Sequence, residues 1–109
     1  MDGLKAINEM SELQIRLNKA IEQMRAWGIE HADKDRNYKV ALMEWILRLR
    51  DEDYPVTIIK EIAYGKVGQE RFERNKAEVM YKSSLENVNS LKLQMRILDN
   101  QIQREWGRE

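Results

Sequence analysis

The residues best suited to chemistry gather around the single histidine of the chain. His31 lies among the carboxylates of Glu30, Asp33 and Asp35, and it stands four residues before Asp35. On a helix, that spacing places both side chains on one face. A zinc site uses three or four ligands, and this pair falls short of that number. We therefore interpret the group as a polar layer that fixes helix register, and we expect no metal.

Other catalytic arrangements are missing from the sequence. It contains no cysteine, and no serine lies in a recognisable nucleophile motif. The glycine-containing segment 65–68 lacks the spacing and the Gly-Lys-Ser/Thr ending of a phosphate-binding loop. The acidic cluster 51–53 fits a solvated loop better than a divalent-cation site. The sequence thus predicts a protein that is not an enzyme, and it indicates no cofactor and no small-molecule substrate.

Nucleic-acid binding is a second option, because basic and aromatic side chains are interleaved between residues 60 and 82. Tyr64 and Phe72 offer rings for stacking on unpaired bases. Four glutamates in this stretch offset six basic residues, whereas binding by counterion release recruits several uncompensated cations. A solvated helix with local ion pairs is therefore favoured, with nucleic-acid contact as the alternative. The candidate contact residues are Lys60, Lys66, Arg71, Arg74 and Lys76.

The elements that hold these residues are defined by a few helix-breaking positions. Pro55 is the only proline, and two of the five glycines lie in the segment 54–68. Proline fixes φ and glycine opens left-handed conformations, so the chain is able to turn here. We expect an all-α protein, a long antiparallel helical hairpin with coiled-coil-like packing, in a single domain of residues 1–109. Its first arm covers about 4–51, its elbow helix about 55–64 and its second arm about 69–106.

The first arm carries apolar residues at steps of mostly three or four, which places them on one helix face. They are Ile7, Met10, Leu13, Leu17, Ile21, Met24, Tyr38, Leu42, Trp45 and Leu49. The pattern weakens between Gly28 and Asn37. We favour a continuous helix, because one glycine costs only about 1 kcal/mol relative to alanine. A break at Gly28 would instead give a bundle of three or four helices.

The elbow helix is expected to close the end of the hairpin. Pro55 suits the first turn of a helix, and Gly65 suits the residue after a helix end. The residues that would pack at the tip are Ile58, Ile59 and Ile62, near Leu49 and Phe72.

The second arm has the clearer pattern, with alternating steps of four and three over more than three heptads. This seam for core packing and oligomerisation consists of Ala77, Tyr81, Val88, Leu91, Met95, Leu98 and Ile102, with Ser84 in register. A second stripe, Val79, Leu93 and Ile97, lies outside the seam. One partner helix is unable to cover both, so we expect a homo-oligomer, and the pair Ile46–Leu47 beside the first arm's apolar face supports it. The alternative is that these are singly exposed apolar residues.

Two of the three tryptophans are candidate anchors for a protein partner. Trp45 falls on the apolar face of the first arm and is assigned to the core. Trp27 lies beside Gly28, and Trp106 closes the second arm. Because tryptophan is common at binding hot spots, Trp27 and Trp106 are the candidates.

Charge and hydropathy favour a cytoplasmic protein without membrane contact. Residues 1–53 carry nine basic and eleven acidic side chains, and residues 54–109 carry ten and eight. This imbalance of −2 and +2 is too small to indicate a polyanion partner. The first residues lack the apolar stretch of a signal peptide, and no run approaches the ~20 apolar residues that cross a bilayer.

Three stretches carry a resemblance to known proteins: Tyr-Pro-Val-Thr-Ile-Ile-Lys at 54–60, Arg-Phe-Glu-Arg at 71–74, and Leu-Lys-Leu-Gln-Met-Arg-Ile-Leu at 91–98. Over residues 38–106 the chain resembles small helical proteins encoded by bacteriophages and prophages of Gram-positive bacteria. The resemblance implies the cytoplasm of a bacterial host cell and a role around phage DNA replication, recombination or host takeover. It brings no catalytic residues.

These features predict a non-enzymatic helical protein that self-associates and binds a host or phage protein. The alternative is a nucleic-acid-binding accessory protein of phage replication or recombination, which would use the basic elbow.

Overall fold

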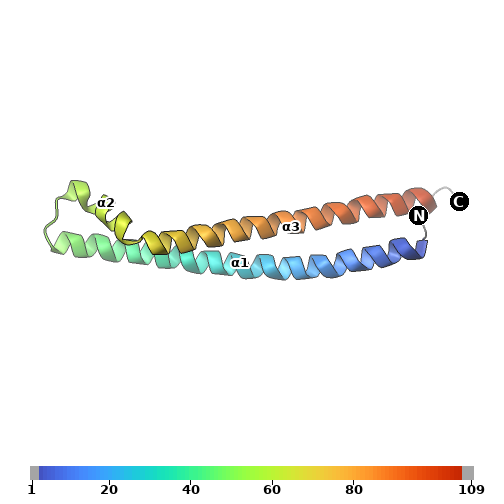
Figure 1. Ribbon diagram of the computed structural model, residues 1–109, viewed down its shortest axis with the longest axis horizontal. Helices are drawn as coiled ribbons and strands as arrows, with labels where there is room; N and C mark the ends of the chain where they lie inside the picture. The colour runs from blue at the N-terminus through green and yellow to red at the C-terminus, as the bar shows by residue number, and fades with distance from the viewer. Residues whose placement is uncertain (1–2, 107–109) are drawn as a thin grey trace. The chain divides into compact units, whose positions relative to one another are not determined.

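The computed structural model describes residues 3–106, which form three helices (Figure 1). Helix α1 covers Gly3–Asp51, α2 covers Val56–Lys66 and α3 covers Gly68–Trp106. No strand occurs within this range, so the expectation of an all-α protein is confirmed. Within the same residues, no helix combines the length and the apolar character that crossing a bilayer would require.

The chain divides into two compact units, which we describe separately. The first combines Met1–Ala26 with Lys82–Glu109, and we call it the terminal unit. The second is Trp27–Tyr81, and we call it the elbow unit because it contains α2. Helix α1 and helix α3 each contribute residues to both units.

The terminal unit is built on residues seven apart in both helices. Its buried cluster contains Ala6, Leu13, Leu17 and Ala20 of α1 with Val88, Leu91 and Leu98 of α3. A β-carbon at Gly3 would lie 3.8 Å from the Trp106 ring, so the start of α1 adjoins the end of α3 in this unit. Complete burial of one leucine or valine side chain contributes about 1.5–3 kcal/mol. The heptad spacing therefore supplies the apolar contact of this unit.

The elbow unit buries the end of α1 against α2. Leu49 of α1 forms a buried cluster with Ile59 and Ala63 of α2, and Ile62 packs beside them. The expected contact of Ile59 and Ile62 with Leu49 is present. Ile58, one residue and about 100° around the helix from Ile59, is 38% exposed.

Phe72 was also expected at this tip, and that expectation is wrong. The Phe72 side chain is 58% exposed and lies outside the buried cluster. It stands five residues before the buried Ala77, which is about 140° around α3 at 100° per residue. The ring therefore belongs to the outer face of α3.

Helix α1 ends in a Schellman motif centred on Asp53. The Asp53 backbone has φ 60° and is the only residue other than glycine with a positive φ among residues 3–106. The Tyr54 N–H donates to the Leu49 carbonyl at 3.2 Å, and the Asp53 N–H donates to that of Arg50 at 3.1 Å. These two bonds satisfy carbonyls that the helix end would otherwise leave without partners. Pro55 then precedes α2 as its N-cap, with ψ 134°.

Only Val67 separates α2 from α3, so the expected helix end at Gly65 is wrong. Gly65 lies inside α2, and none of the described glycines has a positive φ. The Val67 N–H donates to the Ala63 carbonyl at 3.2 Å, and the Val67 carbonyl accepts from the Arg71 N–H at 3.0 Å. Because the helical bonding pattern continues on both sides of Val67, no left-handed glycine is needed. The Val67 side chain is fully buried.

Helix α1 continues through Gly28 without interruption. A β-carbon at this position would lie 3.2 Å from Cε1 of Tyr81, which is closer than an ordinary van der Waals contact. The glycine therefore gives the Tyr81 ring room to lie against α1. At Gly28 the weak apolar pattern reflects a close contact between helices, and α1 does not break there.

Candidate functional site

The polar layer expected around His31 lies between α1 and α3 in the elbow unit. The His31 and Tyr81 rings stack with centroids 6.4 Å apart and planes 8° from parallel. One turn further along α1, the Asp35 carboxylate accepts an ion-pair contact from Lys39 at 2.8 Å and lies 3.9 Å from Arg74 of α3. The layer thus joins the two helices through one stacked pair and one ion-pair group.

Asp35 is the one residue in this layer with a clear shift in acidity. The hydrogen bond from Lys39 is the largest cause, and it lowers the pKa of the Asp35 carboxyl below its ordinary value. The positive charges of Lys39 and Arg74 act in the same direction, while partial desolvation raises the pKa. The carboxylate is therefore held in its charged form, which suits a structural ion pair. A general acid needs the opposite shift.

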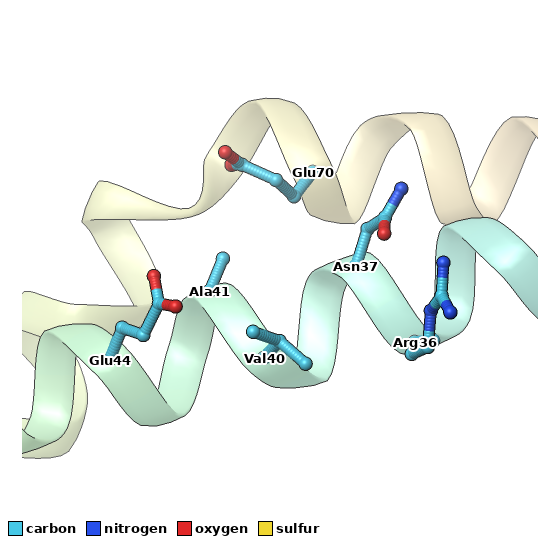
Figure 2. Close-up of a pocket in the computed structure, with 6 residues that line it drawn as sticks. All are labelled: Arg36, Asn37, Val40, Ala41, Glu44 and Glu70. Atoms are coloured by element: carbon cyan, nitrogen blue, oxygen red, sulfur yellow. The ribbon is translucent and has the colours of Figure 1, made fainter.

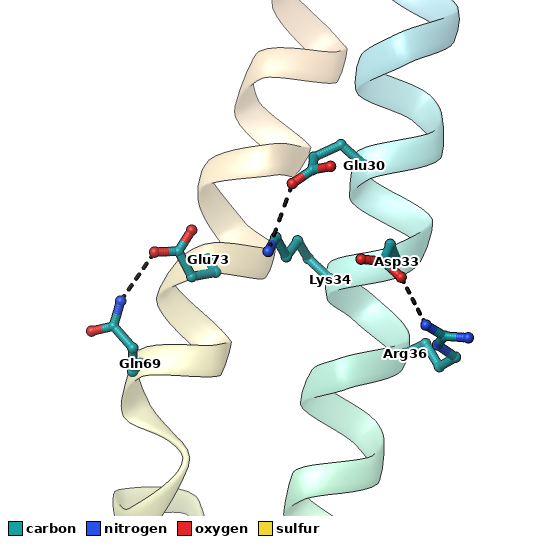
Figure 3. Close-up of polar contacts among 6 residues, drawn as sticks. All are labelled: Glu30, Asp33, Lys34, Arg36, Gln69 and Glu73. Atoms are coloured by element: carbon teal, nitrogen blue, oxygen red, sulfur yellow. Dashed lines mark hydrogen bonds and ion pairs between the residues drawn. The ribbon is translucent and has the colours of Figure 1, made fainter.

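The acidic residues next to His31 are engaged with neighbours on their own helix. Glu30 pairs with Lys34 at 3.7 Å and Asp33 pairs with Arg36 at 2.8 Å (Figure 3). Figure 3 also shows a similar local bond on α3, from Gln69 to Glu73 at 3.0 Å. Within residues 3–106, no three His, Asp or Glu side chains come together as a metal-binding group.

Three of the five candidate nucleic-acid contacts lie against aromatic rings of the chain itself. Lys66 lies 5.3 Å from the Trp45 ring centroid, and Arg48 lies 4.5 Å from the same ring. Arg71 lies 3.6 Å from the Tyr64 ring centroid, and its Nη1 donates to the Tyr64 carbonyl at 2.7 Å. Tyr64, offered above as a base-stacking ring, is thereby covered on one face.

The third of these cations, Arg74, contacts two residues of α1. Its guanidinium lies 4.5 Å from the Tyr38 ring centroid, beside the contact with Asp35. The other two candidates, Lys60 and Lys76, are exposed. Among the described residues, Arg74 alone of the five lies near a carboxylate, and the ring contacts of Lys66 and Arg71 leave their charges uncompensated.

The seam residues of the second arm all face the interior of their own unit. Ala77, Val88, Leu91 and Leu98 are buried, while Tyr81, Met95 and Ile102 are half-buried. Contact between α1 and α3 therefore already covers the face that was expected to serve both core packing and oligomerisation.

The tryptophans differ in their surroundings. Trp45 is half-buried beneath Arg48 and Lys66, and Trp27 is also half-buried. Trp106 is exposed and lies beside Gly3. Of the two candidate anchors, Trp106 is the more accessible.

The second stripe of α3 remains exposed. Val79 is 61% exposed, Leu93 52% and Ile97 48%. In the elbow unit the face around Val79 is a shallow groove with an almost wholly apolar lining. We call it the α3 groove, and its lining residues are Phe72, Asn75, Lys76, Val79 and Met80.

Helix α1 has a matching apolar surface that the sequence interpretation missed. Val40, Met43 and Leu47 are all about half exposed, and we call them the α1 stripe. Their spacing of three and four could have revealed a second face of this helix. Ile46 and Leu47 were together expected to support a homo-oligomer, but Ile46 is half-buried and packs on the cluster around Leu49.

An acidic groove borders the α1 stripe. Figure 2 shows Ala41 and Asn37 directed toward α3, whereas Val40 lies across α1. Glu44 of α1 and Glu70 of α3 line the same groove, with Arg36 at its other end. Within the described range, the side chains of Glu44 and Glu70 have no hydrogen bond or ion pair with another residue. Two uncompensated carboxylates therefore lie close to the α1 stripe.

Comparisons with protein-family models, with curated proteins and with solved structures found no match for this chain.

Proposed function

We propose that this protein is a non-enzymatic helical interaction protein that self-associates and binds a second protein. The observation that supports the proposal is the pair of exposed apolar surfaces on α1 and α3, which lie outside the buried contact between these helices. Grouped apolar side chains on a surface mark sites of contact with other molecules more often than isolated ones do.

The strength of such a contact follows from the exposed side chains. Burying a half-exposed leucine or valine contributes about 1 kcal/mol, half of the value for complete burial. Association must overcome about 4–15 kcal/mol of lost translational and rotational freedom. A contact of three or four such side chains on each copy is therefore weak by itself. We expect association that depends on protein concentration, with more than one surface engaged.

The finer architecture also belongs to this proposal. We propose that α1 and α3 form one antiparallel hairpin with coiled-coil-like packing, so that the seam residues hold the arms together and the second stripe holds the copies. Homo-oligomers built on heptad patterns follow the same principle.

The setting is proposed from the resemblance to phage and prophage proteins. In the cytoplasm of a bacterial host, the second partner would be a host or phage protein, with the exposed Trp106 as an anchor and Trp27 as a weaker candidate. The nucleic-acid alternative has little support, because Lys66, Arg71 and Arg74 lie against aromatic rings of the chain.

Light scattering over a range of protein concentrations tests the proposal. The expected result is a molar mass above that of the 13.0 kDa chain, rising with concentration. Leu93→Glu should lower the mass, because it places a charge in the stripe. Asn87→Glu, at an exposed position of α3 outside the stripe, should leave the mass unchanged and serves as the matched control.

A strict monomer at every concentration would contradict the self-association. Capture of partners from a bacterial host lysate tests the second part, with Trp106→Ala as the variant expected to lose them. Equal recovery by the wild type and Trp106→Ala would remove Trp106 as the anchor. For nucleic acid, absence of binding at low salt would exclude the alternative, since phosphate contacts are strongest there.

A further inference from the structure

The α3 groove carries one charge between two apolar residues. Phe72 and Val79 stand seven residues apart on the outer face of α3, and Lys76 lies between them at the fourth position. All three side chains are exposed. The Lys76 side chain makes no hydrogen bond or ion pair with any described residue. A partner for this groove needs two apolar side chains about two helical turns apart, with an acidic group between them.

The α1 stripe has this pattern with the opposite charge. Val40 and Leu47 also stand seven residues apart, and Glu44 lies at the fourth position. Val40 and Leu47 are 51% and 50% exposed. Glu44 lines the acidic groove of Figure 2 and has no ion pair among residues 3–106. The two surfaces therefore present the same spacing, apolar–charged–apolar, with a lysine on one and a glutamate on the other.

Within one chain these two charges lie at different levels of the elbow unit. Asp35 of α1 faces Arg74 of α3 at 3.9 Å, and Trp45 of α1 faces Lys66 at 5.3 Å. These two contacts show that α1 runs antiparallel to this part of the chain. Glu44, nine residues after Asp35 on α1, therefore lies beside the α2–α3 junction. Lys76 lies beyond Arg74 in the opposite direction along α1. The glutamate and the lysine are therefore unable to satisfy each other within the chain.

We infer that the α3 groove of one copy binds the α1 stripe of a second copy of this chain. Phe72 and Val79 pack against Val40 and Leu47, and Lys76 pairs with Glu44. Lys76 and Glu44 each stand four residues after the first apolar residue and three before the second, so they lie opposite each other in a parallel pairing and one residue apart in an antiparallel one. This inference rests on the proposed self-association and names one of the contacts that perform it.

Opposite charges favour this contact over a symmetric one. Packing the α3 groove against the same groove of a second copy would bring two Lys76 side chains together, and packing two α1 stripes would bring two Glu44 side chains together. Like charges in contact disfavour an interface. A contact between two different surfaces closes as a dimer if each copy gives its groove to the stripe of the other, and otherwise it continues as a ring or an open chain.

Charge exchange tests this contact on the full chain. Lys76→Glu and Glu44→Lys are each expected to weaken the concentration-dependent increase in molar mass, by about tenfold in association constant, because each replaces an attractive pair by a repulsive one. The chain carrying both substitutions, and an equimolar mixture of the two single variants, should recover wild-type association to within about threefold. Lys92→Glu changes the same charge at another exposed position of α3 and should have no effect.

Sedimentation velocity at about 50 and 300 mM salt gives the readout, with helix content checked by circular dichroism. Lys76→Gln and Glu44→Gln remove one charge each and should weaken association less than the reversals. If the wild type associates while the reversals have no effect, or if the double variant and the mixture fail to recover, this contact is wrong and self-association stands. If the wild type remains monomeric, the proposed self-association and this contact both fail.

Discussion

Replacing Asp53 by glycine should stabilise the protein, because Asp53 occupies the left-handed position of the Schellman motif. Its φ of 60° carries a steric penalty for a residue with a β-carbon, which is about 1–2 kcal/mol for ordinary residues and smaller for aspartate. The carboxylate also lies next to the negative end of the α1 dipole, an unfavourable position by about 0.3–1 kcal/mol. Both effects disappear in Asp53→Gly.

Part of this gain is lost in the unfolded chain. Glycine has more conformations to lose on folding, which costs roughly 0.5–1 kcal/mol. The net expectation is a stabilisation of about 0.5–1 kcal/mol. With an unfolding entropy near 2.1 cal/mol/K per residue, this raises the melting temperature of a 109-residue chain by about 2–4 °C.

Thermal unfolding followed by circular dichroism at one protein concentration measures the effect. Asp53→Asn separates the two causes, because it removes the charge and keeps a side chain that tolerates the left-handed region. Asp53→Val should lower the melting temperature, since a β-branched side chain fits φ 60° poorly. Glu52→Gly is the matched control, because Glu52 lies in the same turn without a positive φ. A lower melting temperature for Asp53→Gly would refute the assignment of strain to this residue.

Two further predictions concern packing and acidity. Leu91→Ala should destabilise the protein by about 2–5 kcal/mol because Leu91 is buried in the terminal unit. Leu93→Ala, two residues away and half exposed, should change stability by less than about 0.5 kcal/mol. Equal losses of stability in urea unfolding would contradict the described buried and exposed faces of α3. Because the pKa of Asp35 is lowered in the folded protein, chiefly by Lys39, the contribution of its carboxylate is complete above the unfolded pKa of about 3.9 and is lost as pH falls through the folded value. The melting temperature of Asp35→Asn should therefore lie below that of the wild type by a constant amount above about pH 5, and the difference should shrink below pH 4; a difference that is independent of pH would refute this role.

The sequence was informative where a single physical rule dominates. Pro55 marks the turn between α1 and α2, because proline is unable to continue the hydrogen bonding of a preceding helix. The heptad spacing of the second arm identified the buried face of α3, since buried apolar positions must recur with the helical period. The continuity of α1 was also favoured, although the close contact of Gly28 with Tyr81 was not foreseen.

The errors arose where two interpretations fit the same residues. Gly65 is a plausible helix terminator, but α2 continues through it because the next turn keeps its hydrogen bonds. Phe72 is a typical core residue by type, and only its position around α3 shows that it faces outward. The acidic cluster at 51–53 gave no indication that Asp53 adopts a left-handed conformation, since aspartate is also common in solvated loops.

The candidate site was the least predictable part. The five basic residues were chosen by charge alone, and a linear sequence does not show that Lys66, Arg71 and Arg74 lie against Trp45, Tyr64 and Tyr38. Such contacts depend on how α1, α2 and α3 pack within the elbow unit. The α1 stripe was missed for the opposite reason, because its spacing was masked by the stronger apolar pattern on the other side of the helix.

The single-residue junction at Val67 has a consequence for how this chain tolerates changes in length. Inserting or deleting one residue there would rotate α2 by about 100° about its axis relative to α3 and would turn Ile59 and Ala63 away from Leu49. The connection between α1 and α2 contains four residues outside both helices and is better able to absorb such a change. Variants of this protein that differ in length within the elbow should therefore gain or lose residues between Glu52 and Pro55, and the phase between α2 and α3 should stay fixed.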